Sequence, residues 1–165
     1  MPDIKFDLIE LGGGAGSSTV ISPAMFDEFC LPYDRRVVQA LHEVGLSSVY
    51  HTCGGMMAIL DHIPSMGCDA SETLSPPGVG GDIKTTEDRL RVKNILGSRV
   101  ALIGGIDQNG LLTTGTPEQI TREVQACFET FGSVGGYICS ASDHFFHSPV
   151  DNLKAFARAA AECRY

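Results

Sequence analysis

The residues best suited to chemistry in this sequence are a histidine and a cysteine separated by one position. His51 and Cys53 stand in the stretch His-Thr-Cys-Gly-Gly, directly after a short apolar run. Imidazole nitrogen and thiolate sulfur are ligands that zinc prefers, and alternate side chains of an extended strand point to the same side. The pair could hold one metal ion, or the two could be ordinary residues at a strand end.

Other groups that can bind metal follow other apolar runs. These groups are Glu10, Glu72, Asp107, Cys139, Asp143 and His144. In proteins whose strands alternate with helices, ligands bind beyond the carboxyl ends of the strands, where the loops begin. We therefore expect these groups to meet His51 and Cys53 on one face of the fold.

The apolar runs that precede these groups have the pattern of strands. Strands are predicted over residues 6–11, 47–53, 69–74, 100–105 and 136–140. The runs are short, and glycine- or proline-containing segments follow several of them. The strands are expected to position the polar groups that come after them.

Helical periodicity and capping residues occupy the segments between the strands. Helices are predicted over 22–44, 55–65, 86–96 and 116–131, with a last helix after residue 148. Pro32 is expected to kink or split the first of these helices. Ser22 and Ser148, each followed by proline, are expected N-caps, and Thr116 opens a capping box with Gln119.

Five consecutive β-α units predict an α/β fold with a parallel sheet covered by helices. They could form an open doubly wound sheet, or the C-terminal part of a (β/α)₈ barrel. A complete barrel typically needs about 250 residues. The 165 residues of this chain could therefore hold little more than half of one.

The composition limits the class of protein. Hydrophobic residues make up 43% of the chain and charged residues 19%, which is typical of one globular domain. The net charge of −8 repels phosphate backbones, so no nucleic-acid partner is expected. No apolar run approaches the ~20 residues of a membrane helix, and residues 1–5 lack signal-peptide features. We predict a cytoplasmic protein with no membrane contact and with reduced cysteines.

Several stretches, in order along the chain, resemble one family. They are Ser22-Pro23-Ala24-Met25-Phe26-Asp27-Glu28-Phe29, His51-Thr52-Cys53-Gly54, Gly104-Gly105-Ile106-Asp107, Gly115-Thr116-Pro117-Glu118 and Asp143-His144-Phe145-Phe146. The chain resembles the C-terminal half of the uroporphyrinogen decarboxylase and corrinoid/thiol methyltransferase family of (β/α)₈ barrels. The resemblance implies that residues 1–165 form a single segment of that domain without its first β-α units. It also implies a second half-barrel, or further copies of this chain, as partner.

The resemblance further implies a zinc site in the methyltransferase branch of the family. There a His-x-Cys pair and a cysteine at a later strand end hold the ion, which lowers the pKa of an incoming thiol. His51 and Cys53 match that pair, and Glu72 matches a carboxylate ligand of the related cobalamin-independent methionine synthase. Asp143 occupies the position of the later cysteine, and Cys139 lies a few residues before it. The remaining ligand is therefore Asp143 or, alternatively, Cys139.

Three functions follow from the resemblance. The first is a zinc-dependent methyltransferase segment that transfers a methyl group to a small-molecule thiol or from a corrinoid carrier protein, with Asp143 and His144 as catalytic residues. The second is a cofactor-free uroporphyrinogen decarboxylase, in which His144 matches a substrate-pocket histidine but Cys53 is unexpected. The third is a half-barrel that is inactive alone and serves as a partner subunit.

Overall fold

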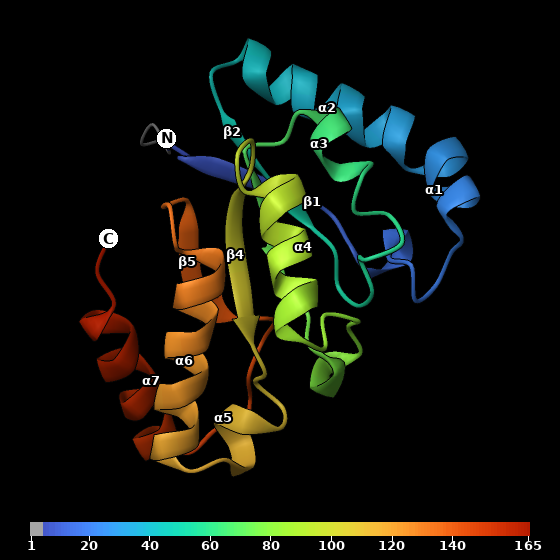
Figure 1. The fold of residues 1–165 in the computed structure, drawn as a ribbon. Helices are drawn as coiled ribbons and strands as arrows, with labels where there is room; N and C mark the ends of the chain where they lie inside the picture. The colour runs from blue at the N-terminus through green and yellow to red at the C-terminus, as the bar shows by residue number, and fades with distance from the viewer. Residues whose placement is uncertain (1–4) are drawn as a thin grey trace.

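Five strands form one parallel sheet in the computed structural model, which describes residues 5–165 (Figure 1). The strands are β1 (Leu8–Gly12), β2 (Ser47–His51), β3 (Ala70–Thr73), β4 (Ala101–Ile106) and β5 (Tyr137–Ala141). They lie side by side in chain order, each parallel to its neighbour. The predicted parallel sheet is confirmed. A doubly wound sheet reverses its strand order at one point, so the consecutive order excludes that alternative.

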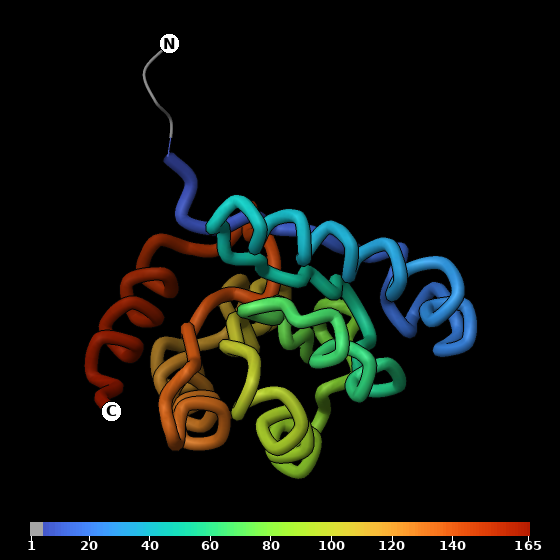
Figure 2. Tube along the Cα trace, turned by 90° about the horizontal axis from the view of Figure 1, so that it is seen from above, coloured from blue at the N-terminus to red at the C-terminus, as the bar shows by residue number. Residues whose placement is uncertain are grey.

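Helices cover one face of the sheet. They are α1 (Pro23–Phe29), α2 (Leu31–Glu43), α3 (Ile63–Met66), α4 (Thr86–Leu96), α5 (Leu111–Thr114), α6 (Pro117–Phe131) and α7 (Val150–Glu162). Figure 1 shows α4 and α6 in front of the sheet, and Figure 2 shows α4, α6 and α7 following one another around its outside. One covered face and one open face are expected of an arc of a (β/α)₈ barrel, whose inner face packs against the strands opposite.

The hydrophobic core lies between the sheet and these helices. Tyr50, Leu102 and Ile106 point from the strands into the core and are at most 1% exposed. Side chains that alternate with them point to the other face. There Leu8 and Ile138 are 51% and 56% exposed. The sheet therefore has a packed outer face and an open inner face.

Three predicted helices differ from the observed ones. The helix expected over 22–44 is split at Cys30, as Pro32 had indicated. The helix expected over 55–65 is reduced to Ile63–Met66, because Pro64 has no N–H for the carbonyl four residues earlier. Ser148 does not cap the last helix, and its hydroxyl is buried without a partner among the described residues. The extended Pro149 occupies the cap position instead, which moves the helix start away from that hydroxyl.

Strand bounds also shift by one or two residues, and one shift affects the site. β2 was expected to reach residue 53, but it ends at His51, and Cys53 lies in the following loop. His51 and Cys53 therefore do not share one extended strand, and the prediction that such a strand turns both to the same side is wrong. Their proximity depends on the conformation of the loop instead.

The described residues contain no helix that is both long and apolar enough to cross a membrane. Residues 1–4, on which the expectation of no signal peptide partly rests, lie outside the described residues. The cytoplasmic location and the absence of a nucleic-acid partner stay predictions.

Asp69 connects the beginnings of β2 and β3 to α2. Its Oδ2 accepts hydrogen bonds from the backbone N–H of Ser48 at 2.7 Å and from the Ser48 hydroxyl at 3.1 Å. The same oxygen lies 2.9 Å from Nε2 of His42. Partial burial would raise the pKa of Asp69, but the hydrogen bonds from Ser48 and His42 outweigh it and lower the pKa.

Replacing Asp69 with asparagine should lower the free energy of unfolding by about 1 kcal/mol at neutral pH. The side chain is 45% exposed, so solvent screening keeps this loss small. Because folding lowers the pKa, the stabilisation is present above the ordinary value of 3.8 and is lost as the pH falls through the folded value. Urea unfolding at neutral and acidic pH measures the difference, with Asp61→Asn as an exposed control. If the difference in unfolding free energy between the wild type and Asp69→Asn is as large in acid as at neutral pH, this account is wrong.

Candidate metal centre

Three side chains that can bind metal meet at the carboxyl end of the sheet. They are His51 at the end of β2, Cys53 in the next loop, and Asp143 in the loop after β5. One ligand atom from each lies within 4.8 Å of the other two. The Cys53 thiol donates a hydrogen bond to Oδ2 of Asp143 at 3.1 Å. The chain therefore brings together a nitrogen, a sulfur and an oxygen ligand.

Asp143 also connects this group to His144. Its Oδ1 accepts a hydrogen bond from the backbone N–H of His144 at 2.7 Å and lies 2.7 Å from Nδ1 of the same residue. Partial burial would raise the pKa of Asp143, but the hydrogen bonds from Cys53 and His144 outweigh it and lower the pKa. The His144 side chain is 83% exposed. A proton on His144 can therefore exchange with solvent one residue away from the metal-binding group.

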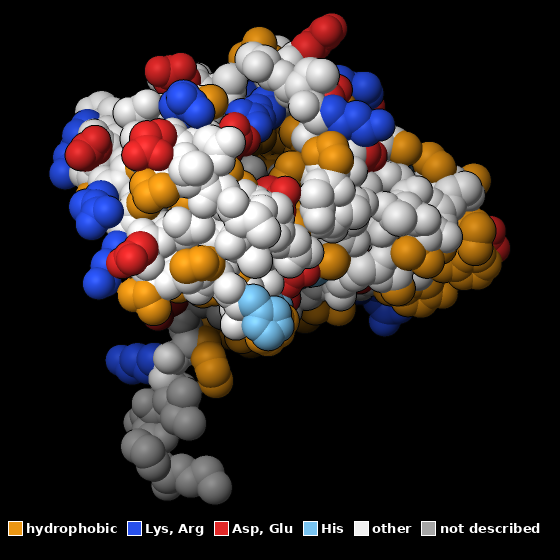
Figure 3. All heavy atoms as spheres, turned by 90° about the horizontal axis from the view of Figure 1, so that it is seen from below, with side chains coloured by type: hydrophobic (Ala, Val, Ile, Leu, Met, Phe, Trp, Pro, Cys, Tyr) orange, Lys and Arg blue, Asp and Glu red, His pale blue; other side chains and the backbone are white. Residues whose placement is uncertain are grey.

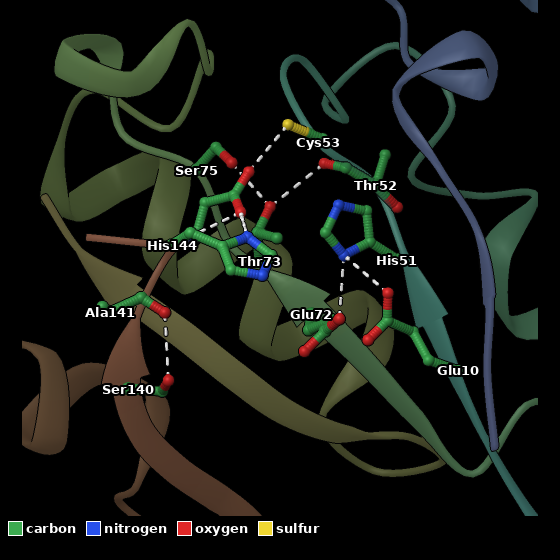
Figure 4. Close-up of polar contacts among 11 residues, drawn as sticks. Glu10, His51, Thr52, Cys53, Glu72, Thr73, Ser75, Ser140, Ala141 and His144 are labelled. Atoms are coloured by element: carbon green, nitrogen blue, oxygen red, sulfur yellow. Dashed lines mark hydrogen bonds and ion pairs between the residues drawn. The ribbon is translucent and has the colours of Figure 1, made fainter. Parts of the chain in front are cut away.

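Two carboxylates hold the other side of the His51 ring. Nδ1 of His51 donates a hydrogen bond to Oε1 of Glu72 at 2.8 Å and lies 3.5 Å from Oε1 of Glu10 (Figure 4). The hydrogen bond with Glu72 raises the pKa of His51, against the opposing effect of partial burial. With Nδ1 occupied, Nε2 is the ring nitrogen that can face Cys53 and Asp143.

Glu72 therefore lies beside His51 rather than beside Cys53. Glu10, His51 and Glu72 form a second group whose ligand atoms lie within 4.8 Å of one another. Burial and the charge of Glu72 raise the pKa of Glu10. Glu10 was predicted among the metal-capable groups of this face, and the parallel pairing of β1 with β2 places its side chain beside His51.

Two other expected residues are not in the metal-binding groups of the described chain, although Cys139 borders the hollow beside them. Cys139 alternates with Ile138, which is on the inner face, so its thiol packs against the hydrophobic core. It belongs to neither group of ligands within the described residues. Asp107 accepts hydrogen bonds from the backbone N–H groups of Asn109 at 2.9 Å and Gly110 at 2.8 Å, and it borders a different hollow.

The loop that carries Cys53 is fixed by side chains from two distant segments. Oδ1 of Asp82 accepts a hydrogen bond from the N–H of Met56 at 2.9 Å, and Oδ2 accepts one from the N–H of Met57 at 3.1 Å. The Thr19 hydroxyl accepts a hydrogen bond from the N–H of Gly55 at 2.7 Å. No sequence motif marked Asp82 or Thr19, because their partners are backbone groups far away in the sequence.

Gly54 allows the loop that carries Cys53 to pack closely against Ser17 and Thr19. Its φ is +107°, a conformation that residues with a Cβ rarely adopt. A Cβ here would lie 3.0 Å from Oγ1 of Thr19 and 3.1 Å from Oγ of Ser17. On the other side of the loop, the Thr73 hydroxyl donates to the carbonyl of Thr52 at 3.1 Å. The position of Cys53 is therefore set by contacts on both sides of its loop.

The neighbouring carboxylate keeps the Cys53 thiol protonated. The hydrogen bond to Asp143, partial burial and the charge of Asp143 raise the pKa of Cys53 to about 11. Metal ligands must be deprotonated, so an ion that binds here has to displace this proton. The hollow beside the group has a volume of about 370 Å³, and its described lining includes no lysine or arginine.

The fold and this site can be compared with known proteins. Residues 7–163 match the family model described as "Uroporphyrinogen decarboxylase (URO-D)". The chain belongs to the URO-D family. The family resemblance expected from the sequence is confirmed.

Relatives in the URO-D family include enzymes of two chemistries. A methylated-thiol–coenzyme M methyltransferase of Methanosarcina mazei is 26% identical over 155 residues, covering 94% of this chain and 38% of that protein. A methylcobamide:CoM methyltransferase of Methanosarcina acetivorans is 27% identical over 163 residues, covering 96% and 43%. A uroporphyrinogen decarboxylase of Aromatoleum aromaticum is 34% identical over 123 residues, covering 72% and 31%. The chain thus spans less than half the length of each of these relatives.

A solved structure shares the fold of this URO-D family chain. The structure of a methyltransferase from Methanosarcina mazei matches with a TM-score of 0.71 at 22% identity. The match covers 94% of this chain and 42% of that one. The five-stranded arc is therefore a fold shared with part of a longer protein.

Replacing Asp143 with asparagine should lower the pKa of Cys53 in the metal-free protein from about 11 toward 9.0. The variant removes the negative charge that disfavours the thiolate, and the thiolate is the reactive form. Alkylation by iodoacetamide in EDTA across alkaline pH, followed by peptide mass spectrometry, measures the change. Cys30 and Cys163 serve as internal controls in the same protein. An unchanged profile for Cys53 would show that the two side chains do not interact.

Proposed function

We propose that this URO-D family chain carries the zinc centre of a methyl-transferring enzyme. The observation that supports the proposal is the convergence of His51, Cys53 and Asp143 within 4.8 Å. Three protein ligands with one open position are typical of catalytic zinc sites. A carboxylate on the remote nitrogen is typical of ligating histidines, and Glu72 supplies it. The donor set therefore fits the metal.

The side chains of this centre have distinct roles in the proposal. Nε2 of His51, Sγ of Cys53 and Oδ2 of Asp143 would hold the ion, and Glu72 fixes the proton on Nδ1 of His51. When bound, zinc would lower the pKa of an incoming thiol and so favour its thiolate. His144, hydrogen-bonded to Asp143 and open to solvent, accepts the proton that the thiol loses.

The proposed reaction transfers a methyl group from a corrinoid carrier protein to a small-molecule thiol. The thiolate sulfur uses its electron pair to form the new bond to the methyl carbon. The electron pair of the broken bond stays on the carrier, so the step needs no external oxidant or reductant. The relative from Methanosarcina acetivorans, a methylcobamide:CoM methyltransferase, supports this choice of donor.

The charge of the site disfavours the alternative of a uroporphyrinogen decarboxylase. Its substrate carries many carboxylates, and such groups are usually bound by arginine or lysine. The described residues that line the site hollow include neither, but they include Glu10, Glu72 and Asp143. A polycarboxylate would meet like charges on this part of the barrel.

Zinc binding tests the proposed centre directly. The EDTA-treated chain should bind one equivalent of Zn²⁺, and His51→Ala, Cys53→Ala and Asp143→Ala should each weaken binding by more than about 100-fold, because each removes a ligand. Glu72→Gln should weaken it by about 10- to 100-fold, because only the orientation of His51 is affected. Competition with a chromophoric chelator measures the affinities. Substitution by Co²⁺ should give a thiolate charge-transfer band that Cys53→Ala removes.

Cys139→Ala is the matched control for these zinc measurements. Its thiol is partly buried against the core and belongs to neither ligand group of the described residues, so both affinity and the Co²⁺ spectrum should equal those of the wild type. Zinc retained in Asp143→Ala but lost in Cys139→Ala would transfer the ligand role to Cys139. Absence of stoichiometric zinc in the wild-type chain would reject the metal centre.

We further propose that additional β-α units cover the inner face of the sheet. Leu8 and Ile138 are more than half exposed there, and β1 and β5 are the edge strands of the described sheet. Exposed apolar surface and open strand edges favour pairing with other strands. The covering units could belong to the same polypeptide or to a separate subunit, as the larger size of the relatives supports.

Residues 1–165 expressed alone should therefore self-associate. Leu8→Glu with Ile138→Glu should shift the population toward monomer, because the inner face then carries charges. Light scattering after size-exclusion chromatography measures the mass over a range of concentrations. Val44→Glu, at a 70% exposed position on the outer surface, is the control and should leave association unchanged. A wild-type chain that stays monomeric at high concentration would contradict the need for covering units.

A further inference from the structure

A second hollow lies outside the proposed metal centre, between the N-terminal parts of α4 and α6. It has a volume of about 780 Å³ and is also bounded by α5 and the turn Pro77–Val79. Figure 3 views this end of the molecule and shows the hollow with lysine and arginine side chains at its rim. Binding sites for small molecules typically have volumes of about 300 to 1,000 Å³. We call this feature the outer hollow.

The outer hollow and the metal centre lie on opposite sides of one loop. Thr73 lines the metal centre, whereas Pro76, Pro77 and Gly78 line the outer hollow. Both hollows are at the carboxyl ends of β3 and β4, where α/β proteins bind ligands. The residues that hold the proposed zinc do not line the outer hollow.

Basic side chains gather at the outer hollow of this acidic chain. Lys84, Arg89 and Arg122 line it, although the protein has a net charge of −8. Arg89 forms an ion pair with Glu123, which joins α4 to α6. Lys84 and Arg122 form no ion pair with any of the described residues. Two positive charges of the lining are therefore not neutralised by contact.

The two acidic residues of the lining, Asp107 and Glu123, already have partners within the protein. Glu123 is bound by Arg89. Oδ1 of Asp107 accepts the backbone N–H groups of Asn109 and Gly110. Oδ2 of Asp107 packs against Gly78 so closely that any Cβ at that position would overlap it. The lining carries three cations and two carboxylates, a net charge of +1, while Asp88 and Glu118 outside it interact electrostatically with Lys84 and Arg122.

The rest of the lining is partly apolar. Ile83 is only 3% exposed, and Pro76, Leu111 and Ala126 lie around the same space. These side chains can contact a hydrocarbon group but cannot satisfy a charge. The combination favours a ligand with an anionic end and a compact apolar body.

We propose that the outer hollow binds a small organic anion whose headgroup is a phosphate, sulfonate or carboxylate. Arg122 and Lys84 contact the headgroup, since guanidinium and ammonium groups form charge-assisted hydrogen bonds with such oxygens. The apolar body lies against Pro76 and Leu111, which are only half-buried. This site does not depend on the proposed zinc centre or on methyl transfer.

Titration of the full chain with phenyl phosphate tests the proposal. Chemical-shift changes should cluster at the residues that line the outer hollow, and isothermal calorimetry at low salt should give the affinity. Arg122→Ala and Lys84→Ala should each weaken binding by about tenfold, because each removes a charge-assisted hydrogen bond. Arg91→Ala, which removes an exposed cation of α4 outside the lining, should leave it unchanged. Cys53→Ala should also leave it unchanged, which separates this site from the zinc centre.

The choice of ligands separates charge from apolar contact. Benzenesulfonate and benzoate should bind at the same residues and rank the headgroups, whereas phenol and benzylamine should bind much more weakly. Phenol binding as tightly as phenyl phosphate would overturn the proposal, because the apolar surface alone would then explain binding. Undiminished affinity in the Lys84→Ala/Arg122→Ala double variant would overturn it as well. Amide spectra check the fold of each variant, and both replaced side chains are exposed.

Discussion

The alternation of side chains along parallel strands is the constraint on which the site depends. Each strand of the sheet must turn one set of side chains to the helices, because those contacts form the core. The other set is then presented together on the inner face. The register of the sheet pairs His51 with Glu72. It also pairs the strand that carries Glu10 with the strand that ends at His51. The same alternation removes Cys139 from the site.

Strand alternation does not determine where Cys53 points, because β2 ends two residues earlier. Its place is fixed by the hydrogen-bonding needs of the loop backbone, which Asp82, Thr19 and Thr73 meet from three other segments. A buried peptide group needs a partner, so these side chains determine the path of the loop. The path in turn brings the thiol to Asp143, whose charge disfavours the thiolate until a cation replaces the proton.

Much of the fold was predictable because its causes are local. The capping box of Thr116 and Gln119 placed the start of α6, helical periodicity placed α4, and the alternation of strand and helix gave the parallel sheet. The errors occurred where local signals competed. Pro64 shortened α3, and Pro149 displaced Ser148 as the cap of α7, because the missing N–H and restricted φ of proline outweighed the capping and periodicity signals.

The sequence by itself determined the family, the order of the β-α units and the residue types that could bind a metal. It left Asp143 and Cys139 as alternatives, because side chains four positions apart would face the same way in one extended strand. Only the tertiary structure placed Asp143 beside Cys53 and Glu72 on the remote nitrogen of His51. These contacts join residues 21 and 90 positions apart, and their geometry depends on strand register and loop path. No local pattern in the chain encodes those two quantities.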